Sequence, residues 1–128
     1  MSDCLFCKIV SGEIPSLKIY EDEKYLAFLD VFPMTKGHTL VIPKKHYAKV
    51  WDVKEVGEYF EIVRKIALEY RVKTGNEVRS MIYGEQISHA HIHLFPFNGK
   101  WNEAISNINP EQMPTSEGPG IQETLHIT

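Results

Sequence analysis

The run HAHIHLF at positions 89–95 restricts the fold of this chain more than any other segment. Successive side chains of a β-strand point to opposite faces, so a strand here would present His89, His91 and His93 on one face. The alanine, isoleucine and leucine between them would form the other face, which is apolar and able to pack on a helix. The run therefore predicts a strand with a covered apolar face and a polar face rich in imidazole.

One long helix is predicted between Asp52 and Gly75. Asp52 is a plausible N-cap with Glu55 three residues later, and Gly75 is a natural stop. Apolar side chains recur at three-to-four spacing between these ends, as on the buried face of an amphipathic helix. They are Val53, Val56, Phe60, Val63, Ile66 or Ala67, and Tyr70. The charged residues between them are expected to form a solvated face.

Short runs supply the rest of an α+β domain. Strands are predicted over residues 17–20, 25–30, 37–43, 78–83 and 90–97, with a short helix or turn over 4–11. From Asn98 onward the chain is polar, lacks periodicity and has Trp101 as its one large anchor. We therefore predict an antiparallel sheet within a core of residues 1–97, and a tail of residues 98–128 that wraps the domain or a partner subunit.

Composition narrows the function classes. The chain has 128 residues, enough for one domain, with 43% hydrophobic and 24% charged residues, as in ordinary globular proteins. A net charge of -3 argues against a nucleic-acid partner. No stretch approaches the roughly 20 apolar residues of a membrane span. The first residues lack a basic segment before an apolar core, so we expect no signal peptide, no membrane partner and a cytoplasmic location.

The imidazole row admits two chemical interpretations. A stripe chosen only for solubility would more often use Lys, Glu or Thr. In the first interpretation, two histidines ligate a catalytic metal together with a third protein ligand and an open position. In the second, one imidazole attacks phosphorus, and its neighbours set which ring nitrogen carries the proton. The residues alone leave both interpretations open.

Several segments in one order resemble the histidine-triad (HIT) superfamily, in its Hint-like and bacterial branch. They are the 89–95 run, CLFCKIVSGEIPS from residue 4, YLAFLDVFPMTKGHTLVIPKKHY from residue 25, and the helix that follows. The resemblance extends from about residue 4 to residue 96 and is specific because the segments occur together. It implies the HIT fold, an antiparallel β-sheet with one long and one short helix.

The resemblance implies a role for individual residues. His91 matches the nucleophile that takes up the nucleoside monophosphate, His93 and His38 match the histidines that support it, and Asp30 matches the acid that binds the ribose hydroxyls. The residues that match the apolar base pocket are Leu5, Phe6, Ile9, Phe28, Val31 and Leu40. Without the resemblance, Asp30 is typical of a strand-ending turn and the two phenylalanines are typical of core packing.

The resemblance also implies a structural zinc. Cys4 and Cys7 form a short chelating pair, and His46 and His89 match the two histidine ligands found in bacterial relatives. Such a Cys2His2 set closes a tetrahedral site that stabilises a fold and is not required for catalysis. It would hold the N-terminal segment against the sheet as one wall of the base pocket. The alternative is two reduced thiols beside a surface histidine.

Two departures from the family pattern concern substrate choice. The loop before His89 is shorter than usual by about five residues, and the tail after Phe97 lacks the usual Trp-Pro-Pro ending. Gln86, and after it Ser88, are the nearest substitutes for the phosphate donors of the longer loop.

We therefore predict a homodimeric purine-nucleotide hydrolase or transferase. It would cleave the α-phosphorus bond of nucleoside phosphoramidates or dinucleoside polyphosphates through a nucleotidyl-histidine intermediate. The alternative is a nucleotide-binding or scaffolding protein of the family with little catalysis.

Overall fold

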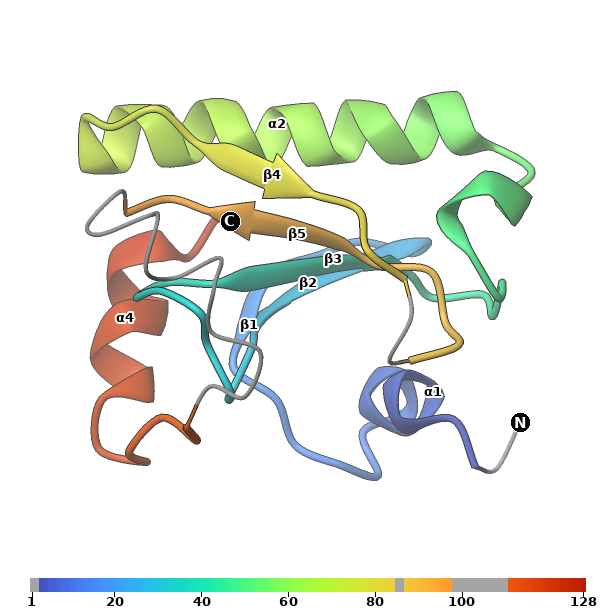
Figure 1. Ribbon diagram of the computed structural model, residues 1–128, viewed down its shortest axis with the longest axis horizontal. Helices are drawn as coiled ribbons and strands as arrows, with labels where there is room; N and C mark the ends of the chain where they lie inside the picture. The colour runs from blue at the N-terminus through green and yellow to red at the C-terminus, as the bar shows by residue number, and fades with distance from the viewer. Residues whose placement is uncertain (1–2, 85–86, 98–110) are drawn as a thin grey trace.

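The fold is one five-stranded antiparallel sheet with helices around it (Figure 1). The computed structural model describes residues 3–84, 87–97 and 111–128. The elements are α1 (Leu5–Ser11), β1 (Lys18–Glu21), β2 (Tyr25–Leu29), β3 (Thr39–Pro43), the 3-10 turn η1 (Val50–Asp52), α2 (Val56–Thr74), β4 (Arg79–Met81), β5 (Ile92–Phe95) and α4 (Gly118–Leu125). The strands lie in the order β1-β2-β3-β5-β4, and each neighbouring pair is antiparallel. The predicted α+β antiparallel architecture is confirmed.

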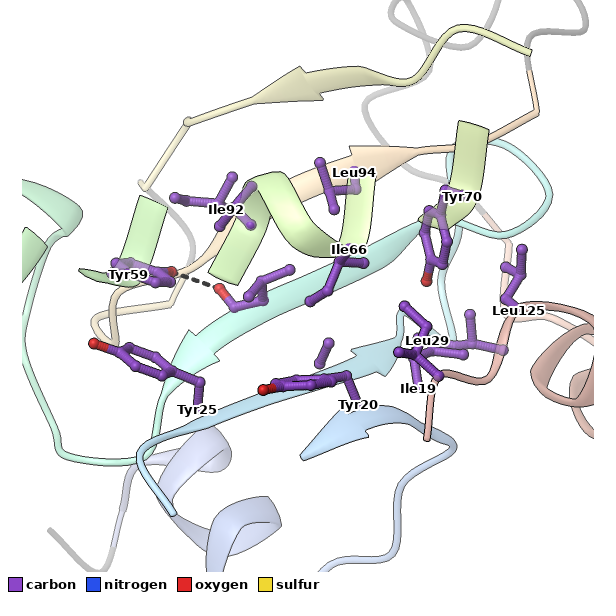
Figure 2. Close-up of a cluster of buried hydrophobic side chains, with 14 of the residues drawn as sticks. Ile19, Tyr20, Tyr25, Leu29, Tyr59, Ile66, Tyr70, Ile92, Leu94 and Leu125 are labelled. Carbon is purple, nitrogen blue, oxygen red and sulfur yellow. Dashed lines mark hydrogen bonds between the residues drawn. The ribbon is translucent and has the colours of Figure 1, made fainter. Parts of the chain in front are cut away.

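Two apolar clusters cover the two faces of this sheet. Every residue of β2 and β3 is buried, because alternate side chains of each strand enter opposite clusters. On the α2 side, Ala90, Ile92 and Leu94 pack with the inner face of the helix, as the 89–95 run predicts (Figure 2). On the other side, Phe6 and Ile9 of α1 pack against β2 and β3. The histidine face of the run is therefore turned toward α1.

The long helix begins later than predicted. Residues Val50–Asp52 form a separate 3-10 turn in which the Asp52 carboxylate accepts the Lys49 backbone N–H at 3.1 Å, and α2 starts at Val56 with Glu55 as its N-cap. The predicted C-terminal stop is confirmed, since Gly75 follows with a φ of 70°.

The buried face of α2 also differs from the prediction at one position. Phe60 is 40% exposed, whereas Tyr59 is fully buried. Tyr59 stacks on Tyr25 at 5.7 Å between ring centroids, and its hydroxyl donates to the Val41 carbonyl of β3 (Figure 2). A tyrosine can enter a core when its hydroxyl finds such an acceptor.

The C-terminal segment contains a helix that the sequence analysis did not predict. Helix α4 lies beside β1 and α2, and Ile121 and Leu125 enter the α2-side cluster together with Ile127. The Ile127 backbone N–H donates to the Ile19 carbonyl at 2.8 Å. The helix has only eight residues and starts Gly-Pro-Gly, so its periodicity is too short to stand out. Trp101, the predicted anchor, lies outside the described residues.

Helices able to cross a membrane are absent from the described ranges, since none combines the necessary length and apolarity.

Candidate functional site

Four buried imidazoles form a connected group under α1. His89 and His91 lie in the segment that enters β5, and His93 lies within that strand. The Phe6 ring of α1 meets the His89 and His91 rings edge-on, at 5.8 and 5.4 Å between centroids. His38 joins them from the residue before β3, and its Nε2 lies 2.8 Å from Nδ1 of His93. The pairing of β3 with β5 therefore brings a fourth histidine to the row.

Backbone hydrogen bonds determine the tautomers of His38 and His93. The Met34 backbone N–H donates to Nδ1 of His38 at 3.1 Å, so the His38 proton resides on Nε2 and is donated to Nδ1 of His93. The proton of His93 then resides on Nε2. That nitrogen is buried and has no hydrogen-bond partner among the described residues. This series of hydrogen bonds therefore ends at the Nε2–H group of His93, which can donate to a ligand.

His38 and His93 are both neutral near pH 7. Burial, reinforced by the neighbouring imidazoles, lowers the pKa of His38 to about 3 and that of His93 to about 4. The two rings consequently act as dipolar donors and carry no positive charge at this pH.

His91 has the opposite tautomer. Its Nδ1 lies 2.8 Å from the His89 carbonyl oxygen, which can only accept, so Nδ1 carries the proton. The lone pair of Nε2 remains available. Burial is the main effect that lowers the pKa of His91, and the charge of Lys49 acts in the same direction. His91 is therefore a neutral imidazole with one nucleophilic nitrogen.

A cleft of about 610 Å³ lies between α1 and the ends of β2 and β3. Its volume falls within the range of small-molecule sites. All seven residues expected to bind the base and ribose line it, namely Leu5, Phe6, Ile9, Phe28, Asp30, Val31 and Leu40. Ile14, Pro15, Ser16, Phe32 and Ile87, among others, line it too, although the sequence analysis did not single them out. The cleft adjoins the imidazole row through Phe6, which contacts both.

Asp30 is the acidic group of this cleft. One of its oxygens accepts the Phe32 backbone N–H at 2.8 Å, and the other lies 3.7 Å from Nδ1 of His38. Burial raises the pKa of this carboxyl above its ordinary value. The second oxygen has acceptor capacity left for hydroxyl groups of a ligand.

The structure describes one of the two expected loop donors. Ser88 is exposed and does not line the cleft, and Gln86 lies outside the described residues. A different polar group lies near His91, since Lys49 lines a small cavity together with it. The sequence analysis missed Lys49 because 42 residues separate the two positions and no local pattern connects them.

The predicted metal ligands converge. The Sγ atoms of Cys4 and Cys7 and the Nδ1 atoms of His46 and His89 all lie within 4.8 Å of one another. The Sγ to Nδ1 distances are 3.2 Å for Cys4 with His89 and 3.4 Å for Cys7 with His46. Neighbouring sulfur and nitrogen ligands of a tetrahedral zinc are about 3.6 Å apart, given its bond lengths.

The protonation of His89 also suits a metal ligand. Its Nε2 lies 2.9 Å from the Pro43 carbonyl oxygen, so Nε2 carries the proton and the lone pair of Nδ1 faces the thiols. Metal-ligating histidines commonly donate their second N–H in this way. The four residues therefore fit a closed tetrahedral metal site.

The same geometry decides between the two interpretations of the imidazole row. Nδ1 of His89 faces the cysteines, whereas Nδ1 of His91 is bound to a carbonyl and Nδ1 of His93 is bound to His38. Within the described ranges, the four-residue Cys/His group is the one set of three or more His, Cys, Asp or Glu whose ligand atoms converge. This arrangement favours a nucleophilic His91 over a metal held by the three histidines.

Comparison with known proteins identifies the family. The family model "HIT domain" matches residues 11–99. This chain belongs to the histidine-triad family. It is 39% identical over 127 residues to Protein hit of Bacillus subtilis, covering 87% of each chain. It is 37% identical over 97 residues to adenosine 5'-monophosphoramidase HNT1 of Saccharomyces cerevisiae, covering 73% of this chain and 61% of the yeast protein.

A solved structure shares the fold. The Zn-bound histidine triad family protein from Mycobacterium smegmatis superimposes with a TM-score of 0.68 and 29% identity, over 97% of this chain and 94% of that one. The predicted membership of the HIT superfamily is thus confirmed. At the level of the family, the yeast relative supports nucleotide hydrolysis. The Cys/His group of this chain could hold a metal ion, and the protein from Mycobacterium smegmatis is zinc-bound.

Proposed function

We propose that this protein cleaves the α-phosphorus bond of nucleoside phosphoramidates or dinucleoside polyphosphates through a nucleotidyl-histidine intermediate on His91. The observation that carries the proposal is the hydrogen bond from His91 Nδ1 to the His89 carbonyl, 2.8 Å long. It directs the free lone pair to Nε2 in a buried row that adjoins a nucleotide-sized cleft. A neutral imidazole in that state is nucleophilic without first losing a proton.

Binding would bring the α-phosphorus to this nitrogen. The apolar walls of the cleft suit a purine base, and Asp30 can accept hydrogen bonds from two ribose hydroxyls. The free Nε2–H of His93 can donate to a phosphoryl oxygen, since it has no partner among the described residues. His38 holds that donor in orientation through its own hydrogen bond.

The reaction would have two steps. Nε2 of His91 forms a bond to phosphorus while the bond from phosphorus to the leaving group breaks, and that electron pair departs with the leaving group. A nucleotide departs as an anion, whereas an amine takes up a proton from the solvent as it departs. The ring becomes a cation whose Nδ1–H is held by the His89 carbonyl. Water then attacks phosphorus and gives up a proton to the solvent while the phosphorus–nitrogen bond breaks. His91 returns as neutral imidazole, and the nucleoside monophosphate is released.

Substitution of the nucleophile tests this proposal. His91→Asn and His91→Ala are expected to lower the turnover of adenosine 5'-phosphoramidate by at least about 1000-fold, because no other described group has a free nucleophilic nitrogen at this position. Binding of adenosine monophosphate, measured by calorimetry, should change less than threefold. Turnover that survives in both variants would refute the covalent role. Tight nucleotide binding by a wild-type protein without turnover would favour the scaffolding alternative.

We also propose that the metal of the Cys/His group is zinc. Two sulfur and two nitrogen donors with no open position are the typical ligand set of structural zinc. Bound zinc would supply folding free energy and hold α1, whose residues Phe6 and Ile9 form a wall of the cleft.

Finally, we propose that two copies of the chain form a homodimer through the outer face of α2. Phe60, Leu68 and Val72 are large apolar residues of this helix that remain 39% or more exposed. Large apolar side chains left exposed on one helix favour association with a partner, and identical chains most often pair around a twofold axis.

A further inference from the structure

The substrate's negative charge has no cationic partner in the base cleft. Lysine and arginine are absent from the described residues that line this cleft. The neighbouring His38 and His93 are neutral near pH 7 and offer a phosphate no positive charge. A polyphosphate nevertheless carries several negative charges, which are costly to bring into a buried site without compensation.

Lys49 supplies a positive charge on another side of His91. A second cavity, of about 50 Å³, is lined by His91, Lys49, Trp51 and Tyr83, together with Ala48, Val50, Ile82, Gly84, His89 and Ala90. It shares no lining residue with the base cleft. The two sites are therefore separate: His91 lines the cavity beside Lys49, and Phe6, whose ring contacts His91, lines the base cleft.

The Lys49 ammonium is held at this cavity. Its Nζ donates to the Gly84 carbonyl, and its Cδ lies 3.8 Å from the position that a Cβ on Gly84 would occupy. One of its three N–H groups is used in this bond, so two N–H donors and the full charge remain for a ligand. The backbone of Lys49 is held in turn by the Asp52 carboxylate at 3.1 Å.

Two aromatic side chains line the same cavity as Lys49 and keep much of their surface in solvent. Trp51 is 74% exposed and Tyr83 is 54% exposed, although both line the cavity. Single exposed aromatics are ordinary, but two of them that line one cavity with a lysine offer ring faces on which a nucleotide base can stack while its phosphates meet the charge.

We infer that Lys49 binds the phosphate of the leaving group and that Trp51 and Tyr83 receive the base attached to it. This inference rests on the proposed function and specifies its substrate class, dinucleoside polyphosphates. When the phosphorus–oxygen bond breaks, its electron pair stays on the departing nucleoside diphosphate. That group leaves as an anion stabilised by the two free N–H groups of Lys49. A departing amine would need to gain a proton and would gain nothing from this charge.

The test compares leaving groups in matched lysine variants. Diadenosine triphosphate releases a nucleotide, ATP releases pyrophosphate without a base, and adenosine 5'-phosphoramidate releases an amine. Lys49→Gln should lower kcat/KM by 10- to 100-fold for the first two substrates and by less than threefold for the phosphoramidate, because one charged hydrogen-bond partner is lost. Lys49→Arg should retain most of the activity. Glutamine can still donate to the Gly84 carbonyl, so this variant separates charge from local structure.

Two further variants sharpen the comparison. Lys54→Gln removes an exposed lysine from the same segment and should leave all three values unchanged. Trp51→Ala should lower kcat/KM roughly tenfold for diadenosine triphosphate and leave ATP unaffected, since only the first leaving group carries a base.

Binding provides a readout that does not depend on turnover. In the His91→Asn background, Lys49→Gln should weaken binding of diadenosine triphosphate at least tenfold and leave adenosine monophosphate unaffected. Equal losses for all ligands, or no loss for the dinucleotide, would overturn the assignment of Lys49. A wild-type protein that cleaves none of the three substrates would refute the proposed function, while the binding comparison would still decide the role of Lys49.

Discussion

Main-chain groups select the reactive nitrogen of each histidine in the row. The Met34 N–H makes His38 an acceptor at Nδ1, and the His89 carbonyl makes His91 a donor at the same atom. A ligand therefore meets a hydrogen-bond donor at His93, which His38 orients, and a free lone pair at Nε2 of His91. Because backbone groups set these tautomers, a change of pH within the neutral range leaves them unaltered.

The lowered pKa of a single residue, His93, makes the free energy of unfolding depend on pH. The folded-state pKa is about 4, below the ordinary value of 6.5, so the unfolded chain binds the proton first as the pH falls. Stability should be greatest above pH 6.5 and decrease between pH 6.5 and 4. The decrease from this residue is about 3 kcal/mol. His38 acts in the same direction.

Chemical denaturation at pH 7 and pH 4.5 measures this effect. His93→Phe keeps an aromatic ring but cannot titrate, so it should show a smaller loss of unfolding free energy between the two pH values. His126→Asn replaces an exposed histidine of the C-terminal segment and should keep the wild-type difference. A His93→Phe variant with the full wild-type pH dependence would contradict the assignment.

At the scale of elements, the position of α1 depends on the metal ligands. The helix has seven residues, and its first turn is held by the Cys4 thiol, which accepts the Cys7 backbone N–H at 3.3 Å. A helix this short is not stable alone. Its contacts with Phe28 and with the Cys/His group keep it on the sheet, and with it the wall of the base cleft.

Removal of the metal should therefore loosen α1 and weaken nucleotide binding. Protein purified without chelator is expected to contain one zinc per chain by plasma mass spectrometry. Cys7→Ser or prolonged chelation should lower Tm by on the order of 10 °C and weaken binding of adenosine monophosphate, because Phe6 and Ile9 move with the helix. Ser11→Ala, at the end of the same helix and outside the cluster, serves as the control. A wild-type protein that contains no metal as purified, and whose Tm does not change after chelation, would rule out the zinc proposal.

At the scale of the whole molecule, the sheet separates two functions. Helices α2 and α1 lie on opposite sides of the sheet (Figure 1). The α2 side, which α4 also covers, carries the larger apolar cluster, whereas the α1 side carries the imidazoles, the cleft and the Cys/His group. The outer surface of α2 is remote from this chemistry because the sheet lies between them. Changes on that surface are therefore expected to alter assembly without altering the tautomers of the site.

The proposed dimer is tested on that surface. The wild-type chain should elute with a mass twice that of the monomer in light-scattering chromatography. The double substitution Leu68→Glu and Val72→Glu should produce a monomer, since it places charges on a buried apolar interface. Glu123→Lys on α4 should leave the mass unchanged. A wild-type monomer at micromolar concentration would refute the dimer.

Local sequence patterns were sufficient to predict the strands, the long helix and the two faces of the 89–95 run, because the periodicity of apolar side chains reflects these elements directly. The start of α2, the burial of Tyr59 and helix α4 required tertiary contacts, because a capping aspartate, a sheet carbonyl and a packed terminus override local preference. The site itself divides in the same way. Resemblance selected His91 and the four residues of the Cys/His group. The position of Lys49 and the tautomers depend on contacts between segments up to 55 residues apart in the sequence.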